Sequence, residues 1–142
     1  MSRSLARLSL VVPLVALLLA AVPSAATWAA PAVAQAGVGY VDVSPAELDA
    51  LLAREDPFLL DVHVPNEGYL AGTDARIPFT DVAARYAELP ADPDARIVVY
   101  CMSGRMSEIA ANDLIGLGYR NVVNLAGGML AWQAAGYPLV PE

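Results

Sequence analysis

The chain of 142 residues contains one cysteine, Cys101, at the point where an apolar β-type run ends and a helical pattern follows a few residues later. The thiolate is the nucleophilic form of cysteine, and nearby positive charge or the N-terminus of a helix stabilises it. The six residues that follow the cysteine are Met102, Ser103, Gly104, Arg105, Met106 and Ser107. We therefore expect Cys101 to act as a nucleophile at the start of a short loop that binds an anion.

The residue types of this loop each have a physical use. Gly104 can adopt backbone angles that are closed to residues with a Cβ, so the loop can turn successive N–H groups inward to form an anion-binding nest. The following helix adds its free N–H groups and the positive end of its dipole, and Arg105 adds a full charge. Ser103 or Ser107 can donate a hydroxyl hydrogen bond. Residues 102–107 are therefore the predicted substrate-binding loop, and their surroundings favour the thiolate of Cys101.

Two other interpretations of this cysteine are compatible with its position at the end of a strand. A small cysteine at the end of a strand can be buried and inert. A phosphatase of the cysteine-loop type places an arginine six residues after the cysteine, where it clamps the phosphoryl oxygens. Here Ser107 occupies that position, which disfavours phosphatase chemistry.

Strand and helix patterns alternate along the chain and must position this loop. Strands are expected at 39–43, 58–62, 77–79, 96–100 and 121–125, and helices at 45–54, 80–88, 106–117 and 129–135. Such alternation predicts an α/β fold with a mainly parallel sheet and helices on both faces. Ligands bind beyond the carboxyl ends of strands in such sheets, which is where Cys101 and Asp61 stand. Asp61 either bonds loop amides and shapes the site or caps the turn after its own strand.

Composition excludes several classes of function. Beyond residue 36 the chain holds six arginines and all fifteen acidic residues, so this part carries a net charge of -9. That charge argues against sequence-independent binding to nucleic acids or anionic membranes. With Cys101 as the only cysteine and His63 as the only histidine, neither a zinc site nor a disulfide framework is expected.

The first 36 residues read as a secretory signal peptide. Arg3 and Arg7 precede an apolar stretch from Leu8 to Val22, and small residues follow. The stretch is shorter than the roughly 20 residues that span a bilayer, so no stable membrane anchor is expected. Cleavage is expected after Ala34 or Ala36, which leaves a single domain at 37–142 in the periplasm or outside the cell. A buried N-terminal helix is the alternative.

Several segments beyond the leader resemble, in order, motifs of the rhodanese homology domain. The segments are Leu59–Val62 followed by Pro65 and Glu67, Val99–Ser107, Leu125–Trp132 and Gly136–Leu139. The resemblance runs from about Val41 to Val140 and implies a parallel five-stranded sheet with helices on both sides. It also implies that Cys101 takes sulfur from a donor such as thiosulfate, holds it as a persulfide and passes it to cyanide or a thiol. The backbone of 102–106 would cradle the transferred sulfur and the oxyanion of the donor, and the resemblance implies that no metal or organic cofactor is required.

The chain departs from the family pattern at three places. Met102 and Met106 stand where many members have arginine, so Arg105 is the only loop cation and we expect a small dianion to bind weakly. The segment Ala71–Asp74 replaces a Gly-His-Ile segment. His63 replaces a common arginine, which would make any salt bridge at that place depend on pH.

The expected function is that of an exported sulfurtransferase that moves a sulfane sulfur from an anionic donor to a thiophilic acceptor through a Cys101 persulfide. The alternative is a sulfur-carrier or anion-binding module that serves a protein partner without turning over small acceptors. The two differ in whether small acceptors are consumed rapidly. The sequence leaves the physiological donor and acceptor open.

Overall fold

A computed structural model describes residues 39–142, so the expected leader and both expected cleavage points lie outside the described residues. The elements in chain order are β1 (Val41–Val43), α1 (Pro45–Leu52), β2 (Phe58–Asp61), β3 (Ala75–Arg76), the 3₁₀ helix η1 (Tyr86–Glu88), β4 (Ile97–Tyr100), α2 (Arg105–Gly116), β5 (Val122–Leu125) and α3 (Gly128–Ala134). The strands form one sheet in the order β1-β5-β4-β2-β3. Every neighbouring pair is parallel, which confirms the expected α/β fold and five-stranded sheet.

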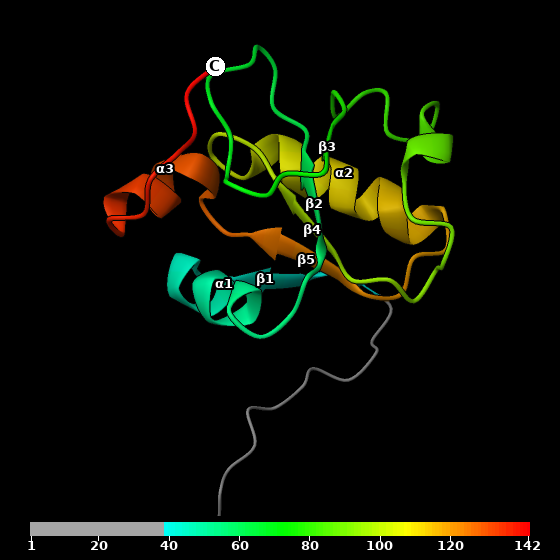
Figure 1. Cartoon of the computed structure of the whole chain (residues 1–142). Helices are drawn as coiled ribbons and strands as arrows, with labels where there is room; N and C mark the ends of the chain where they lie inside the picture. The colour runs from blue at the N-terminus through cyan, green and yellow to red at the C-terminus, as the bar shows by residue number, and fades with distance from the viewer. Residues whose placement is uncertain (1–38) are drawn as a thin grey trace, which may run out of the picture. The chain divides into compact units, whose positions relative to one another are not determined.

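The central strand β4 divides its side chains between two apolar clusters. Val99, and Cys101 just beyond the strand, belong to the cluster that includes residues of α2. Val98 and Tyr100 belong to the cluster that includes residues of α1 and α3. All four β4 residues are buried, as a strand covered on both faces requires. Helices therefore cover both faces of the sheet, as expected, and Figure 1 shows α2 on one side with α1 and α3 on the other.

Helix α1 begins as its sequence predicts. Ser44 and Glu47 form a reciprocal capping box: the Ser44 side chain accepts from the Glu47 amide, and the Glu47 carboxylate accepts from the Ser44 amide at 2.8 Å. Pro45 occupies the first helical position, where a missing N–H costs nothing. The same contacts lower the pKa of Glu47.

Two expected elements differ in the structure. The edge strand was expected at 77–79, but the observed strand β3 lies two residues earlier. Beyond β3 the chain continues beside the end of β2 around Pro78, where the amides of Ile77 and Phe79 donate to the carbonyls of Asp61 and Val62 without forming a regular strand. The helix expected at 80–88 is a series of turns that ends in η1. The Thr80 hydroxyl donates to the Asp81 carboxylate at 2.8 Å, so it does not act as the helix cap that the sequence suggested.

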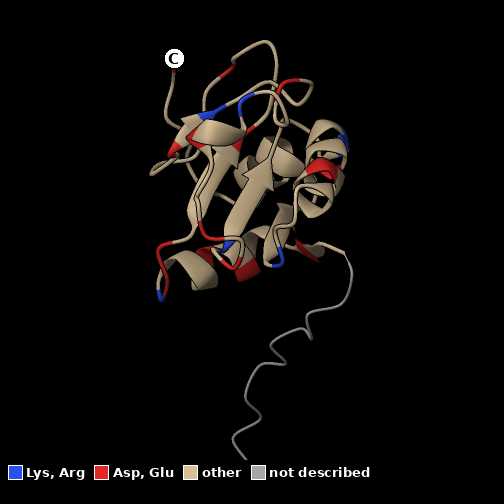
Figure 2. Ribbon diagram, turned by 90° about the vertical axis from the view of Figure 1, so that its right-hand side faces the viewer, with Lys and Arg blue, Asp and Glu red and all other residues tan. Residues whose placement is uncertain are grey.

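Charge and apolar character are distributed as a compact α/β domain requires. In Figure 2 the charged positions lie mainly in loops and helices, and β4 and β5 carry none. Within residues 39–142 no helix is long and apolar enough to cross a membrane.

Candidate active site

The loop that carries Cys101 lies at the carboxyl edge of the sheet. It connects the end of β4 to the start of α2. The Val62 amide, just beyond β2, donates to the Tyr100 carbonyl at 2.9 Å, so the segments that follow β2 and β4 meet at this edge. The position agrees with the rule that ligands bind outside the carboxyl ends of parallel strands.

The first turn of α3 fixes the start of the loop. The Met129 amide donates to the Cys101 carbonyl at 2.9 Å, and the Leu130 amide donates to the Met102 carbonyl at 3.0 Å. This approach requires glycine at position 128, because a Cβ there would lie 2.2 Å from the Cys101 carbonyl oxygen, and φ is +58°. The sequence indicated a glycine turn at this place but not its contact with the cysteine.

The thiol points into the loop. Cys101 is 1% exposed, and the Gly104 amide donates to its Sγ at 3.1 Å. Gly104 has φ +101°, a conformation that favours glycine. The inward N–H is the kind of contact that stabilises a thiolate.

Ser107 completes this arrangement from the first turn of α2. The thiol lies 3.5 Å from the Ser107 Oγ, to which it can donate, and the Ser107 hydroxyl donates to the Gly104 carbonyl at 2.8 Å. Ser107 is fully buried. Its hydroxyl group therefore closes a ring of contacts within the loop that includes the nucleophile.

The other predicted loop residues differ in exposure. Ser103 and Arg105 are exposed, and Met102 and Met106 are half-buried. Arg105 makes no ion pair or hydrogen bond within the described residues, whereas four arginines bind carboxylates, namely Arg76, Arg85, Arg96 and Arg120. Its charge is thus available to a ligand.

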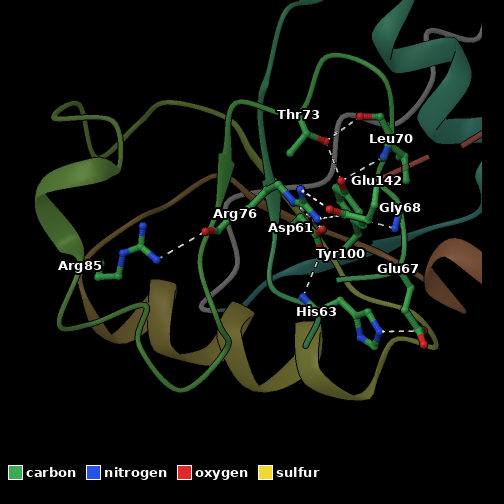
Figure 3. A network of polar contacts seen from close by, with 10 residues as sticks. All are labelled: Asp61, His63, Glu67, Gly68, Leu70, Thr73, Arg76, Arg85, Tyr100 and Glu142. Carbon is green, nitrogen blue, oxygen red and sulfur yellow. Dashed lines mark hydrogen bonds and ion pairs between the residues drawn. The ribbon is translucent and has the colours of Figure 1, made fainter. Parts of the chain in front are cut away.

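Asp61 is buried at the end of β2 and caps the turn that follows. Its Oδ1 accepts from the His63 amide at 2.9 Å, and its Oδ2 lies 3.6 Å from the Arg76 Nε (Figure 3). Burial raises the pKa of Asp61, and the His63 amide and the Arg76 charge partly offset that rise. Of the two alternatives for Asp61, the observed bonds match the turn cap. A supporting role at the active site stays a prediction.

His63 lies in contact with Glu67, four residues along the chain. Its Nε2 lies 3.2 Å from the Glu67 carboxylate, and the pair is ionic only when the imidazole is protonated. His63 is 8% exposed, and its Nδ1 has no hydrogen-bond partner among the described residues.

Contacts between distant segments hold the neighbouring loops, as Figure 3 shows. Thr73 lies in the segment that departs from the family pattern, and its hydroxyl group is 2.6 Å from the Tyr100 hydroxyl group. The Tyr100 hydroxyl group also accepts from the Leu70 amide at 3.1 Å. Glu142 binds Arg76 and accepts from the Gly68 amide. No local pattern in the sequence indicated these partners, which lie up to 74 residues apart.

The described residues contain no cluster of three histidine, cysteine or acidic side chains that could hold a metal ion. The chemistry that the site offers is that of a buried sulfur nucleophile. The Gly104 N–H faces the sulfur, and Arg105, which has no ion-pair partner among residues 39–142, begins α2 directly after Gly104.

Comparison with known proteins gives a consistent result. Residues 44–135 match the family model for the rhodanese-like domain. A protein named sulfurtransferase from Allochromatium vinosum is 38% identical over 96 residues, which cover 65% of this chain and 87% of that protein. Thiosulfate sulfurtransferase GlpE of Pseudoalteromonas translucida is 28% identical over 101 residues, which cover 69% of this chain and 93% of that protein.

Comparison of the fold with solved structures agrees with the sequence matches. The crystal structure of a rhodanese-related protein from Thermoplasma volcanium superposes with a TM-score of 0.62 at 29% identity, and the match covers 72% of this chain and all of that one. The order of the strands, the cysteine loop at the carboxyl edge of the sheet and the sequence matches coincide in one region. The chain therefore belongs to the rhodanese-like domain family.

Proposed function

We propose that this domain transfers sulfane sulfur through a persulfide on Cys101. It takes the sulfur from an anionic donor such as thiosulfate and passes it to a thiol or to cyanide. The observation that carries the proposal is the contact of 3.1 Å from the Gly104 amide to the Cys101 Sγ, at the start of α2 and beside the unpaired Arg105. The sulfurtransferase relatives support sulfur transfer in general.

The chemistry needs two displacements at sulfur. The Cys101 thiolate attacks the outer sulfur of thiosulfate, so a new S–S bond forms and the bond to the sulfonate sulfur breaks. Sulfite leaves with the electron pair of that bond, and the enzyme holds Cys–S–S⁻. An acceptor thiolate or cyanide then attacks the terminal sulfur, and the Cys101 thiolate is released. Both steps balance without a metal or an external oxidant.

The backbone of the loop has a defined part in both steps. The terminal sulfur of a persulfide would lie farther out than the Sγ, where the N–H groups of residues 102–106 face it. The positive end of α2 would stabilise the negative charge that moves onto that sulfur. Arg105 would bind the oxyanion group of the donor from the solvent side, in keeping with its exposure.

Intact-mass spectrometry of the purified protein tests this function. Thiosulfate should add one sulfur atom to the wild type and none to Cys101→Ala, and cyanide should remove it. If the wild type gains no sulfur while its thiol remains free, the proposed donor is wrong. If Cys101→Ala gains sulfur, the proposed nucleophile is wrong.

The second candidate function is that of a sulfur carrier for a protein partner. The observation that favours it is the 1% exposure of the thiol, which limits access by small acceptors. Steady-state assays with cyanide and with small thiols separate the two functions. Many turnovers per minute support the enzyme, whereas one loading event without turnover supports the carrier.

We further propose that the protein acts in the periplasm or outside the cell, on the evidence of residues 1–36. Expression of the full chain with its leader in a bacterium, followed by fractionation and intact-mass analysis, tests this. A mature species that begins after Ala34 or Ala36 in the exported fraction is expected. A full-length species confined to the cytosol would contradict it.

A further inference from the structure

The side of the loop onto which the Cys101 side chain packs is apolar. Cys101 belongs to a buried cluster with Val62, and Phe79 and Met106 are half-buried members that pack against the same cluster. The Phe79 amide donates to the Val62 carbonyl at 3.2 Å, and the Val62 amide donates to the Tyr100 carbonyl, so Phe79 lies at the edge of the sheet where Cys101 stands. The side of the sheet on which the Cys101 side chain packs therefore carries an aromatic ring and a thioether that are partly exposed.

Further apolar side chains flank the loop. Leu130 is 55% exposed, and its amide binds the Met102 carbonyl, so it lies next to the loop at the start of α3. Ile109 is 45% exposed and lies one turn beyond Met106 on α2, on the same side of the helix. We call this set of side chains the apolar rim. Its members are Phe79, Met106 and Ile109 on the side of α2, and Met102 and Leu130 on the side of α3.

Within residues 39–142, Arg105 supplies the unpaired positive charge beside the rim, because Arg76 and Arg85, which lie in the segment around Phe79, are paired with carboxylates. Arg105 is the single loop cation, and Glu108 stands in the same turn of α2 with the opposite charge. The Gly104 amide is already directed at the Cys101 Sγ. A dianion such as thiosulfate would bring two charges to a rim that offers one counter-charge, and an unpaired charge against apolar surface is costly.

We propose that this site selects sulfur donors that carry a single negative charge and an apolar organic group, in preference to the dianion thiosulfate. The apolar rim takes the organic group, and Arg105 with the loop amides takes the charge. The inference rests on the proposed persulfide function and names the class of donor for the same site. An organic thiosulfonate, R–SO₂–S⁻, is a suitable probe.

The transfer step balances for this probe. The Cys101 thiolate attacks the terminal sulfur, the S–S bond of the persulfide forms, and the bond between that sulfur and the sulfonyl sulfur breaks. The sulfinate R–SO₂⁻ leaves with the electron pair. The enzyme reaches the same Cys–S–S⁻ state as it does with thiosulfate.

The test compares three donors with cyanide as the common acceptor. Benzenethiosulfonate has one charge and an aryl group, methanethiosulfonate has one charge and a methyl group, and thiosulfate has two charges. We expect kcat/KM to fall in that order, with the aryl donor about tenfold or more above the methyl donor because part of a ring leaves water. A kcat/KM for thiosulfate equal to or above that for the aryl donor would overturn the inference.

Substitutions in the apolar rim test whether its side chains cause the preference for the aryl donor. Leu130→Gln should lower kcat/KM more for the aryl donor than for thiosulfate, so that the ratio of the two values falls. Met106→Arg should raise the value for thiosulfate and lower the same ratio. Leu117→Gln is the control and should leave the ratio unchanged, since Leu117 is an exposed leucine that follows the last residue of α2, at the end away from the loop. An aryl preference that is unchanged in both rim variants would refute the role of the rim.

Intact-mass measurements and donor kinetics test the persulfide function and the donor preference separately. If none of the three donors adds sulfur to Cys101 by intact mass, the persulfide function itself is wrong. If donors load the cysteine but thiosulfate is the best of them, only the inference about donor class is wrong.

Discussion

Replacement of Ser107 by alanine tests how the loop prepares its nucleophile. In the thiol state the Ser107 hydroxyl donates to the Gly104 carbonyl at 2.8 Å and stands 3.5 Å from the Cys101 sulfur. A hydroxyl group has one proton, so when the thiol ionises this proton can turn from the carbonyl to the sulfur. Ser107→Ala removes that option and leaves the Gly104 amide as the donor to the thiolate.

The hydrogen bonds around Ser107 set the size of the effect. The Gly104 carbonyl also accepts from the Glu108 amide at 3.0 Å, so the variant leaves no buried carbonyl group unpaired. The free energy of unfolding should therefore fall by about 1 kcal/mol, the net worth of one hydrogen bond. In the thiolate state a charged acceptor replaces a neutral one, and the difference between the two bonds is also about 1 kcal/mol, which corresponds to about a fivefold change in the rate of a reaction that uses the thiolate.

The assay is the rate of alkylation by iodoacetamide at one fixed pH near neutrality, measured beside urea denaturation. For Ser107→Ala the rate should fall about fivefold, and Ser107→Thr should restore part of the loss. Thr73→Ala is the control, because it removes a hydroxyl-to-carbonyl bond of similar length, 2.7 Å, together with the contact to the Tyr100 hydroxyl group, and neither contact involves the sulfur. An alkylation rate for Ser107→Ala that matches the wild type would refute the reasoning, whatever the change in stability.

Three further substitutions test the contacts around the site. Tyr100→Phe leaves a buried amide without its acceptor and should lower the free energy of unfolding by about 1–3 kcal/mol in urea; an unchanged value would contradict that contact. Gly128→Ala places a Cβ 2.2 Å from the Cys101 carbonyl oxygen and should abolish sulfur loading, whereas Gly118→Ala, which meets nothing within 4 Å, should retain it. Because the folded state raises the pKa of Asp61 above its usual 3.8, its ionisation opposes folding as pH rises through the raised value. Asp61→Asn should flatten the loss of stability above pH 4, and denaturation across that range measures it.

Local patterns predicted the parts of the fold that depend on local chemistry. The run that forms β4 is apolar and β-branched, and the structure buries it on both faces. The capping box of Ser44 and Glu47 forms as expected. The helix expected after Thr80 failed because the hydroxyl group bonds to the adjacent Asp81 instead of to a helical amide, a competition between neighbours that a cap motif alone does not reveal.

Some features of the site follow from neighbouring residues in the sequence, and others depend on residues that are distant in the chain. The loop with Cys101 and Gly104 is contiguous in the sequence, and its inward amide could be predicted from the residue types. The burial of Ser107 depends on how α2 packs against the sheet, so sequence reasoning placed its hydroxyl group among the substrate contacts, and the structure places it inside the loop. Glu142 lies 66 residues from Arg76, and no periodicity links two such positions.

The hydrogen bonds made by α3 limit how much negative charge the loop can stabilise. The helices α2 and α3 both begin close to the Cys101 loop, but in the first turn of α3 the amides of Met129 and Leu130 are already bonded to loop carbonyls. They stabilise the shape of the loop and are not available to a ligand. Stabilisation of a bound anion then depends on the loop amides, the start of α2 and Arg105. A site with this limited set of donors matches one negative charge better than two, and the comparison of thiosulfonates with thiosulfate measures that difference directly.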